Sequence, residues 1–143
     1  MIVFLSCVSM KNDKRCKAKD MYISSLFEKS YEYAQTLNPD KIYILSAKHH
    51  VLELDEMIDP YNLTLNDMSE KERRKWAHEV IRQCHDKGID FDDEVIFLCG
   101  INYRKYIVRN FKNALEPIAG LPIGKQLKYY TEQIKLNKSK ESE

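Results

Sequence analysis

Small and polar side chains follow three short apolar runs in this 143-residue sequence, and a chemical site could be built from them. The runs end in Leu5-Ser6-Cys7, Leu45-Ser46-Ala47 and Leu98-Cys99-Gly100. If the runs are parallel neighbouring strands, their ends lie along one edge of a sheet, where small side chains let a ligand approach the backbone amides. The sequence therefore predicts a substrate-binding edge that contains Ser6, Cys7, Ser46 and Gly100. The alternative is that small residues merely suit tight turns between strands and helices.

Two lysines, Lys11 and Lys48, follow predicted strand ends by only a few residues. In a partly desolvated pocket, a lysine can act as a nucleophile, a proton donor or a phosphate contact. We therefore expect Lys11 and Lys48 to be the catalytic residues if the protein is an enzyme, although most lysines are surface residues. His49 could bind substrate or transfer protons near neutral pH. Adjacent histidines in an exposed loop are more often solvated.

Three tyrosines, Tyr22, Tyr61 and Tyr103, lie next to predicted strand-end loops. An aromatic ring in such a place could stack on a base, as sites for single-stranded or flipped bases require. The alternative is a core tyrosine whose hydroxyl is hydrogen-bonded. Cys7 could act as a thiolate only if its surroundings lowered its pKa.

The composition is that of a folded globular protein, with 43% hydrophobic and 31% charged residues and a net charge of +1. No run is long enough to span a bilayer and no signal peptide is recognisable, so we expect a cytoplasmic protein without membrane partners. The four cysteines form no C-x-x-C pair, and we expect free thiols, no metal and no cofactor.

Charge is concentrated in two loops of opposite sign. Basic residues crowd positions 11–19, and Glu53, Asp55, Glu56 and Asp59 crowd the central loop. One interpretation is that both loops are solvated and their charges pair locally. The alternative is that the basic loop forms a surface that binds a phosphate backbone.

Strands alternate with helices along the chain. The pattern predicts strands at 2–5, 42–45 and 94–99, a long loop from 46 to 62, and helices starting at Ser25 and Ser69 and covering 103–115 and 125–136. The prediction is therefore a three-layer α/β domain over residues 1–136, with a small, mainly parallel sheet, helices on both faces, and a polar, frayed tail at 137–143. The pattern does not determine strand order or oligomeric state.

Four segments together carry a resemblance to an uncharacterised domain family of bacteria and phages: LSCVSMK with DMYISSLFEKS, IYILSAKHHVLELDEMIDPYN, MSEKERRKWA and LPIGKQL. The central segment is also distantly similar to the peroxide-stress protein YaaA family, which is associated with DNA binding. Cys7, Lys11, Tyr22 and Ser24 resemble a cysteine–lysine–tyrosine–serine pattern in archaeosine synthase. That resemblance implies a fold like that of uracil-DNA glycosylases and adds Ser24 to the substrate-binding residues.

The chain departs from these families at one position. Where the relatives usually have glycine before an aliphatic residue, this sequence reads His50-Val51. Glycine can adopt backbone angles that a histidine resists, so the resemblance does not predict the loop geometry at His50.

Three functions compete on this basis. The first is an enzyme that acts on a nucleobase or its N-glycosidic bond, in DNA, RNA or a free nucleoside, from a pocket at the carboxyl edge of the sheet. The second is a non-catalytic DNA-binding protein that holds phosphates with positions 11–19 and with Arg104, Lys105 and Arg109. The third is a phage-borne or defence-linked protein that binds another protein. We favour the first.

Overall fold

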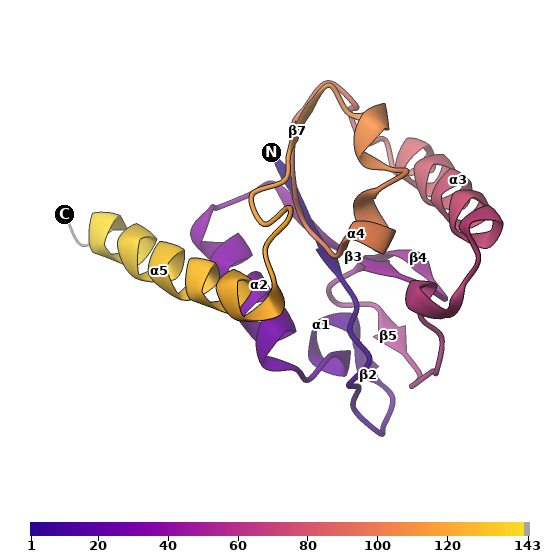
Figure 1. Cartoon of the computed structure of the whole chain (residues 1–143), viewed down its shortest axis with the longest axis horizontal. Helices are drawn as coiled ribbons and strands as arrows, with labels where there is room; N and C mark the ends of the chain where they lie inside the picture. Colours follow the sequence, from indigo (N-terminus) through magenta and orange to yellow (C-terminus); the bar gives the residue numbers. More distant parts are fainter. Residues whose placement is uncertain (142–143) are drawn as a thin grey trace.

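A five-stranded sheet in the order β4-β3-β1-β6-β7 forms the centre of the molecule, and a separate ribbon pairs β2 with β5 (Figure 1). The computed structural model describes residues 1–141. The strands are β1 (Ile2–Ser6), β2 (Cys16–Lys17), β3 (Lys41–Ser46), β4 (His50–Glu53), β5 (Met57–Ile58), β6 (Glu94–Leu98) and β7 (Asn113–Leu115). The helices are α1 (Ala18–Met21), α2 (Ser25–Thr36), α3 (Glu70–Asp86), α4 (Ile101–Arg104) and α5 (Ile123–Glu141), with 3-10 turns η1 (Leu65–Asp67) and η2 (Val108–Asn110).

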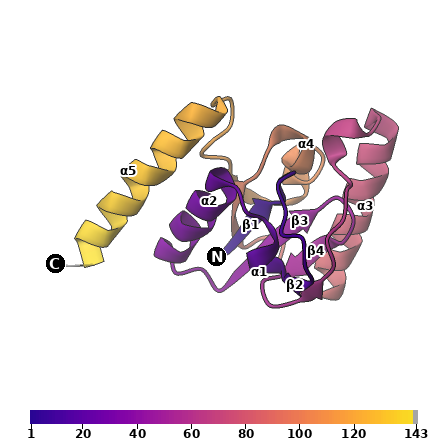
Figure 2. The ribbon, with the colours of Figure 1, turned by 90° about the horizontal axis from the view of Figure 1, so that it is seen from below.

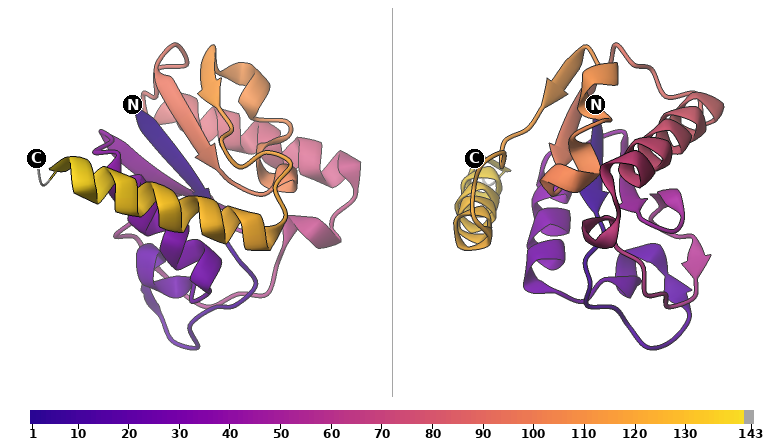
Figure 3. Two further views of the ribbon diagram at one scale, coloured as in Figure 1. Left: turned by 60° about the vertical axis from the view of Figure 1, so that its left-hand side comes forward. Right: turned by 45° about the vertical axis from the view of Figure 1, so that its right-hand side comes forward.

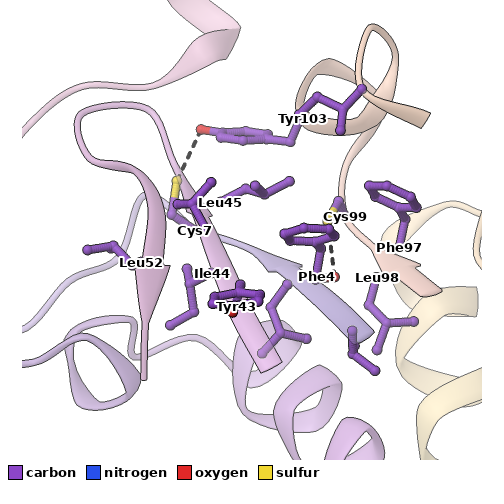
Figure 4. Close-up of a cluster of buried hydrophobic side chains, with 14 of the residues drawn as sticks. Phe4, Cys7, Tyr43, Ile44, Leu45, Leu52, Phe97, Leu98, Cys99 and Tyr103 are labelled. Carbon is purple, nitrogen blue, oxygen red and sulfur yellow. Dashed lines mark hydrogen bonds between the residues drawn. The ribbon is translucent and has the colours of Figure 1, made fainter. Parts of the chain in front are cut away.

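β1 occupies the middle of the sheet because its side chains are apolar on both faces. Val3, Phe4 and Leu5 are completely buried. Phe4 lies opposite Tyr43 of β3 and Phe97 of β6, and the Phe4 and Phe97 rings stack with centroids 5.3 Å apart (Figure 4). β1 is parallel to both neighbours, and β7 is parallel to β6. The prediction of an α/β fold with a small, mainly parallel sheet is confirmed, and the carboxyl ends of β1, β3 and β6 share one edge.

Helices cover both faces of the sheet (Figures 2 and 3). α3 lies on one face. α2 lies on the other, with α5 packed along its outer side, where the rings of Tyr33 and Tyr130 have centroids 5.7 Å apart. α2 and α3 therefore lie on opposite faces of the sheet at β1. This arrangement determines where along the sheet edge a ligand site can form.

Local capping explains where the two long helices of the sheet layers begin. α3 begins as predicted after Ser69, which forms a reciprocal capping box with Glu72. α2 begins after Ser24, whose hydroxyl accepts a hydrogen bond from the amide of Phe27 at 3.2 Å. The expected cap at Ser25 was therefore one residue late.

The segment expected to be a long loop after β3 is in fact folded back on the sheet. β4 pairs antiparallel with β3, with Ser46 opposite His50 and Tyr43 opposite Glu53. β5 pairs with β2 and thereby ties the central segment to the early basic loop. β4 lacks an alternating pattern because Val51 and Leu52 are both buried, at 3% and 1% exposure.

The helix expected at 103–115 does not form as one element. α4 ends at Arg104, η2 forms one short turn, and the chain then enters β7 beside β6. The Asn110 side-chain amide donates to the carbonyls of Tyr106 and Ile107, at 3.2 and 3.1 Å. This capping by a side chain ends the helical turn, and pairing with β6 overrides the helical propensity of the following residues.

α5 continues to Glu141, past the expected end at Leu136. The Asn137 amide donates to the Thr36 hydroxyl at 2.9 Å, which holds the polar end of α5 on α2. Of the tail expected at 137–143, residues 137–141 are therefore helical, and Ser142 and Glu143 lie outside the described residues. Within residues 1–141, no helix combines the length and the apolar character needed to cross a membrane.

Candidate functional site

A cavity of about 540 Å³ opens at the carboxyl edge of β1 and β6, between the amino-terminal ends of α2, α4 and α5. The chain leaves β1 for one neighbour, β3, through α2, and reaches the other neighbour, β6, after α3 on the opposite face. The cavity thus lies at the point where the strand order reverses, which is the position at which open α/β sheets bind ligands. Its volume is in the range of small-molecule sites.

The cavity wall is mainly apolar, with polar groups set into it and no charge. Of the lining residues, all of which lie within positions 1–141, none carries a charged side chain. Hydroxyl groups come from serines on the β1 end and the start of α2, and carboxamides come from Asn66, Asn102 and Gln126. Apolar side chains, including those of Leu26 and Phe27, form the rest of the cavity wall. Because burying an unpaired charge is costly, such a wall suits an uncharged ligand with both apolar and hydrogen-bonding surface.

Cys7 and Tyr103 meet at the inner end of this wall. The Cys7 Sγ donates to the Tyr103 hydroxyl at 3.2 Å, and both side chains are buried (Figure 4). The Leu65 amide also donates to that hydroxyl, at 3.3 Å. Burial, together with the neighbouring thiol, raises the pKa of Tyr103 above its ordinary value. Tyr103 therefore stays neutral at physiological pH and keeps its hydroxyl proton.

A pair of carboxamides joins α4 to η1 at the cavity. Asn102 Nδ2 donates to Asn66 Oδ1 at 2.8 Å. This bond leaves the Asn66 amide group as a donor and the Asn102 carbonyl oxygen as an acceptor. Such a donor–acceptor pair matches the edge of a heterocyclic base, which presents an adjacent acceptor and donor.

A chain of hydroxyl groups runs behind the ends of β1 and β3. Ser46 is 2.7 Å from the Tyr61 hydroxyl, which is 2.6 Å from the Tyr22 hydroxyl. The amides of His49 and Lys48 donate to the Ser46 hydroxyl, at 3.0 and 3.3 Å. Burial raises the pKa of Tyr22 and of Tyr61 above their ordinary values. The chain is therefore a neutral, fixed support for the strand ends.

The two predicted catalytic lysines do not line the cavity. Lys48 is exposed. Lys11 is half-buried, and its ammonium lies over the ring of Tyr61, 4.6 Å from the ring centroid. His49 also lies outside the cavity, where its ring packs nearly perpendicular to the Tyr61 ring, with centroids 5.5 Å apart. Burial, and secondarily the charge of Lys48, lowers the pKa of His49.

The rings of Tyr22 and Tyr61 are packed against neighbouring side chains. Tyr22 is 2% exposed and packs on Phe27 with centroids 5.3 Å apart, and the Tyr61 ring is covered by Lys11 and His49. Their hydroxyls are hydrogen-bonded, as expected for the alternative in which these tyrosines belong to the core. Base stacking on these two rings stays a prediction, and in this conformation Tyr22 presents almost no exposed surface to a base.

The structure divides the predicted site residues into groups. Ser6, Cys7, Ser24, Gly100 and Tyr103 line the cavity. The hydroxyl chain contains Tyr22, Ser46 and Tyr61, with Lys11 beside it. The Lys48 side chain is exposed outside the cavity, and His49 packs against Tyr61 of the hydroxyl chain.

Sequence reasoning missed the three carboxamides of the cavity. Asn102 follows Gly100 by two residues, so the strand-end pattern could have included it. Asn66 lies between the central segment and α3, and Gln126 comes from α5. No spacing near Asn66 signals a site, and Gln126 lies in the LPIGKQL segment that carries the family resemblance. Only the packing of η1 and α5 brings these two residues to the sheet edge.

The basic and acidic loops neutralise one another. Lys17 and Lys19 lie 3.7 and 3.5 Å from a carboxylate oxygen of Asp55, and Arg15 lies 3.0 Å from Asp59. All three contacts bridge the β2–β5 ribbon and its flanking residues. The local charge pairing considered for these loops is present, and it leaves less free positive charge for a nucleic-acid backbone.

The fold and cavity define a class: a small α/β protein whose central parallel strands end at an uncharged ligand-sized cavity. The model of a family of unknown function, DUF6884, matches residues 2–132, and the chain belongs to that family. The chain is also similar to the uncharacterized protein YfjM of Bacillus subtilis (strain 168), with 33% identity over 92 residues. This match covers 64% of the chain and 59% of the length of YfjM.

Proposed function

We propose that this protein is a nucleobase-processing enzyme that holds an uncharged base, free or as part of a nucleoside or nucleic acid, in the cavity at the ends of β1 and β6. The observation that carries the proposal is the wall itself. It combines apolar surface with hydroxyl and carboxamide groups, and it contains no charged side chain among the described residues. Nucleobases are neutral, flat and partly apolar, and their edges carry alternating hydrogen-bond donors and acceptors.

The recognition step uses the Asn66–Asn102 pair. The free amide of Asn66 can donate to an acceptor on the base, and the Asn102 carbonyl can accept from the adjacent donor. Gln126 donates to the Leu121 carbonyl at 2.8 Å, so its own carbonyl oxygen is available to the cavity. A site built to hydrogen-bond a polar edge discriminates strongly against ligands that lack it, because its own polar groups would stay unpaired.

The reaction that we propose is hydrolysis of the N-glycosidic bond. The bond between the sugar C1′ and the base nitrogen breaks, the base leaves with the electron pair, and water adds its oxygen to C1′ and gives a proton to the base. Hydrogen bonds from Asn66 and from cavity hydroxyls would stabilise the negative charge that develops on the leaving base. The proposal also draws on the similarity of Cys7, Lys11, Tyr22 and Ser24 to the glycosylase-like region of archaeosine synthase.

The binding step is tested by thermal melting with a panel of bases and nucleosides, at low and high salt. A ligand that binds only the folded state raises the melting temperature. We expect a shift that survives high salt, and an affinity about tenfold lower for Asn102→Ala, which follows from the loss of one hydrogen-bonding partner worth about 1–2 kcal/mol. Asn62→Ala is the matched control, because Asn62 is exposed and lies outside the cavity.

The reaction step is tested by chromatographic detection of free base after incubation with nucleosides and with short DNA and RNA strands. Binding without any base release would refute the hydrolysis while leaving the base site in place. Absence of binding by every base and nucleoside would refute the whole proposal. Lys11→Ala and Lys48→Ala belong in the same assay, since unchanged turnover in the double variant would exclude the catalytic roles predicted for these lysines.

A further inference from the structure

Three cationic side chains surround the ring of Tyr106, between α3 and η2. Arg74 Cζ and Lys105 Nζ each lie 5.2 Å from the ring centroid, and Arg109 Cζ lies 5.5 Å from it. The Tyr106 hydroxyl donates to a carboxylate oxygen of Glu70, which fixes the ring. One aromatic ring therefore positions three cations that come from two separate segments of the chain.

The charges in this cluster are not balanced. Glu70 lies 2.8 Å from Arg73 and 3.3 Å from Lys105, so its single negative charge already faces these two cations. Arg74 and Arg109 make no ion pair with any carboxylate within residues 1–141. Two guanidinium groups are thus held near the same ring without a counter-charge from the described part of the protein. An anion in the hollow that both arginines border would supply this counter-charge.

The two arginines border a small hollow of about 140 Å³, to which His78 and Asn110 also contribute. At roughly 30 Å³ per water molecule, the hollow holds about four or five waters. That space accommodates one phosphate group. No acidic side chain belongs to the described residues that line it.

We propose that the Arg74–Arg109 hollow binds a phosphate group. The planar guanidinium presents paired N–H donors that match phosphate oxygens, and both arginines border the hollow beside the Tyr106 ring. The group recognised is either free phosphate or the phosphate of a nucleotide or nucleic acid. The inference does not depend on the function proposed for the cavity at β1 and β6.

The test measures binding of two probes, inorganic phosphate by phosphorus NMR titration and a short fluorescent single-stranded DNA by anisotropy, at low salt. The variant Arg74→Gln/Arg109→Gln removes both guanidinium groups. The control variant Lys135→Gln/Lys140→Gln removes the same charge from exposed positions of α5. All four substituted side chains are exposed, and melting curves of each variant verify folding.

The expected result is at least tenfold weaker phosphate binding by the arginine variant and unchanged binding by the lysine variant. If DNA binding weakens in parallel, the site holds backbone phosphates; if DNA does not bind, the site holds free phosphate. Equal binding by all three proteins, equal weakening in both variants, or no phosphate binding by the unmodified protein would each overturn the inference. Catalysis in the cavity is not part of the readout, so this result is independent of the base-release assay.

Discussion

The backbone at His50 gives a stability prediction that can be worked out in numbers. His50 has φ of 65°, in the left-handed region, and it occupies the position where the resembled families have glycine. A residue with a Cβ pays about 1–2 kcal/mol for this conformation. Glycine avoids that cost but loses about 0.4–1 kcal/mol through the greater freedom of its unfolded chain. His50→Gly should therefore be more stable than His50→Ala by about 0.5–1 kcal/mol.

Comparing glycine with alanine isolates the backbone effect, because both substitutions remove the imidazole that stacks on Trp76 with centroids 6.3 Å apart. The measurement is the free energy of unfolding from urea titrations of both variants. Lys48 supplies the control, since it lies in the same turn, is exposed, and has no positive φ. There the order should reverse, with glycine less stable than alanine by about 0.5–1 kcal/mol. The reasoning is refuted if glycine is the less stable residue at both positions.

Two further predictions concern the buried hydroxyl groups. Tyr61→Phe removes the link between Ser46 and Tyr22 and should lower the free energy of unfolding by about 1–3 kcal/mol in urea titrations. The control is Tyr31→Phe, which removes the hydroxyl of a half-buried tyrosine outside this chain and should change the free energy of unfolding little. An equal effect of the two variants would contradict a structural role for the hydroxyl chain. Burial raises the pKa of Tyr22, Tyr61 and Tyr103 in the folded state, so above about pH 10 the unfolded state binds fewer protons and stability must fall as pH rises. Tyrosinate absorbance of these residues should accordingly develop together with the loss of ellipticity in an alkaline titration, and full titration of all nine tyrosines in a still-folded protein would contradict this.

Several features of the fold could be predicted because their causes are local. The strand at the centre of the sheet is a continuous apolar run, and the start of α3 is encoded by Ser69 and Glu72 within four residues. The stop at Gly88 is encoded by a single residue, whose φ of 73° ends the helix. From these elements the sheet edge at Ser6, Cys7 and Gly100 follows, because parallel strands end together.

Other features could not be predicted because they depend on partners far along the chain. β7 is a strand only because β6 lies beside it, and residues 103–115 taken alone have a helical pattern. The stacking faces expected on Tyr22 and Tyr61 are covered by Phe27, Lys11 and His49, which local spacing does not place there.

The sequence by itself determined the class of fold and the edge of the sheet at which a site could form, since both follow from apolar runs, caps and the rule that parallel strands share an edge. Only the tertiary structure decided which side chains face the cavity. It placed Asn66 and Gln126 in the same cavity wall as Ser6, left Lys48 exposed outside the cavity, and paired the basic loop with the acidic one. The physical reason is that these contacts depend on strand order and on how helices cross the sheet, and neither is fixed by interactions between residues that are neighbours in the chain.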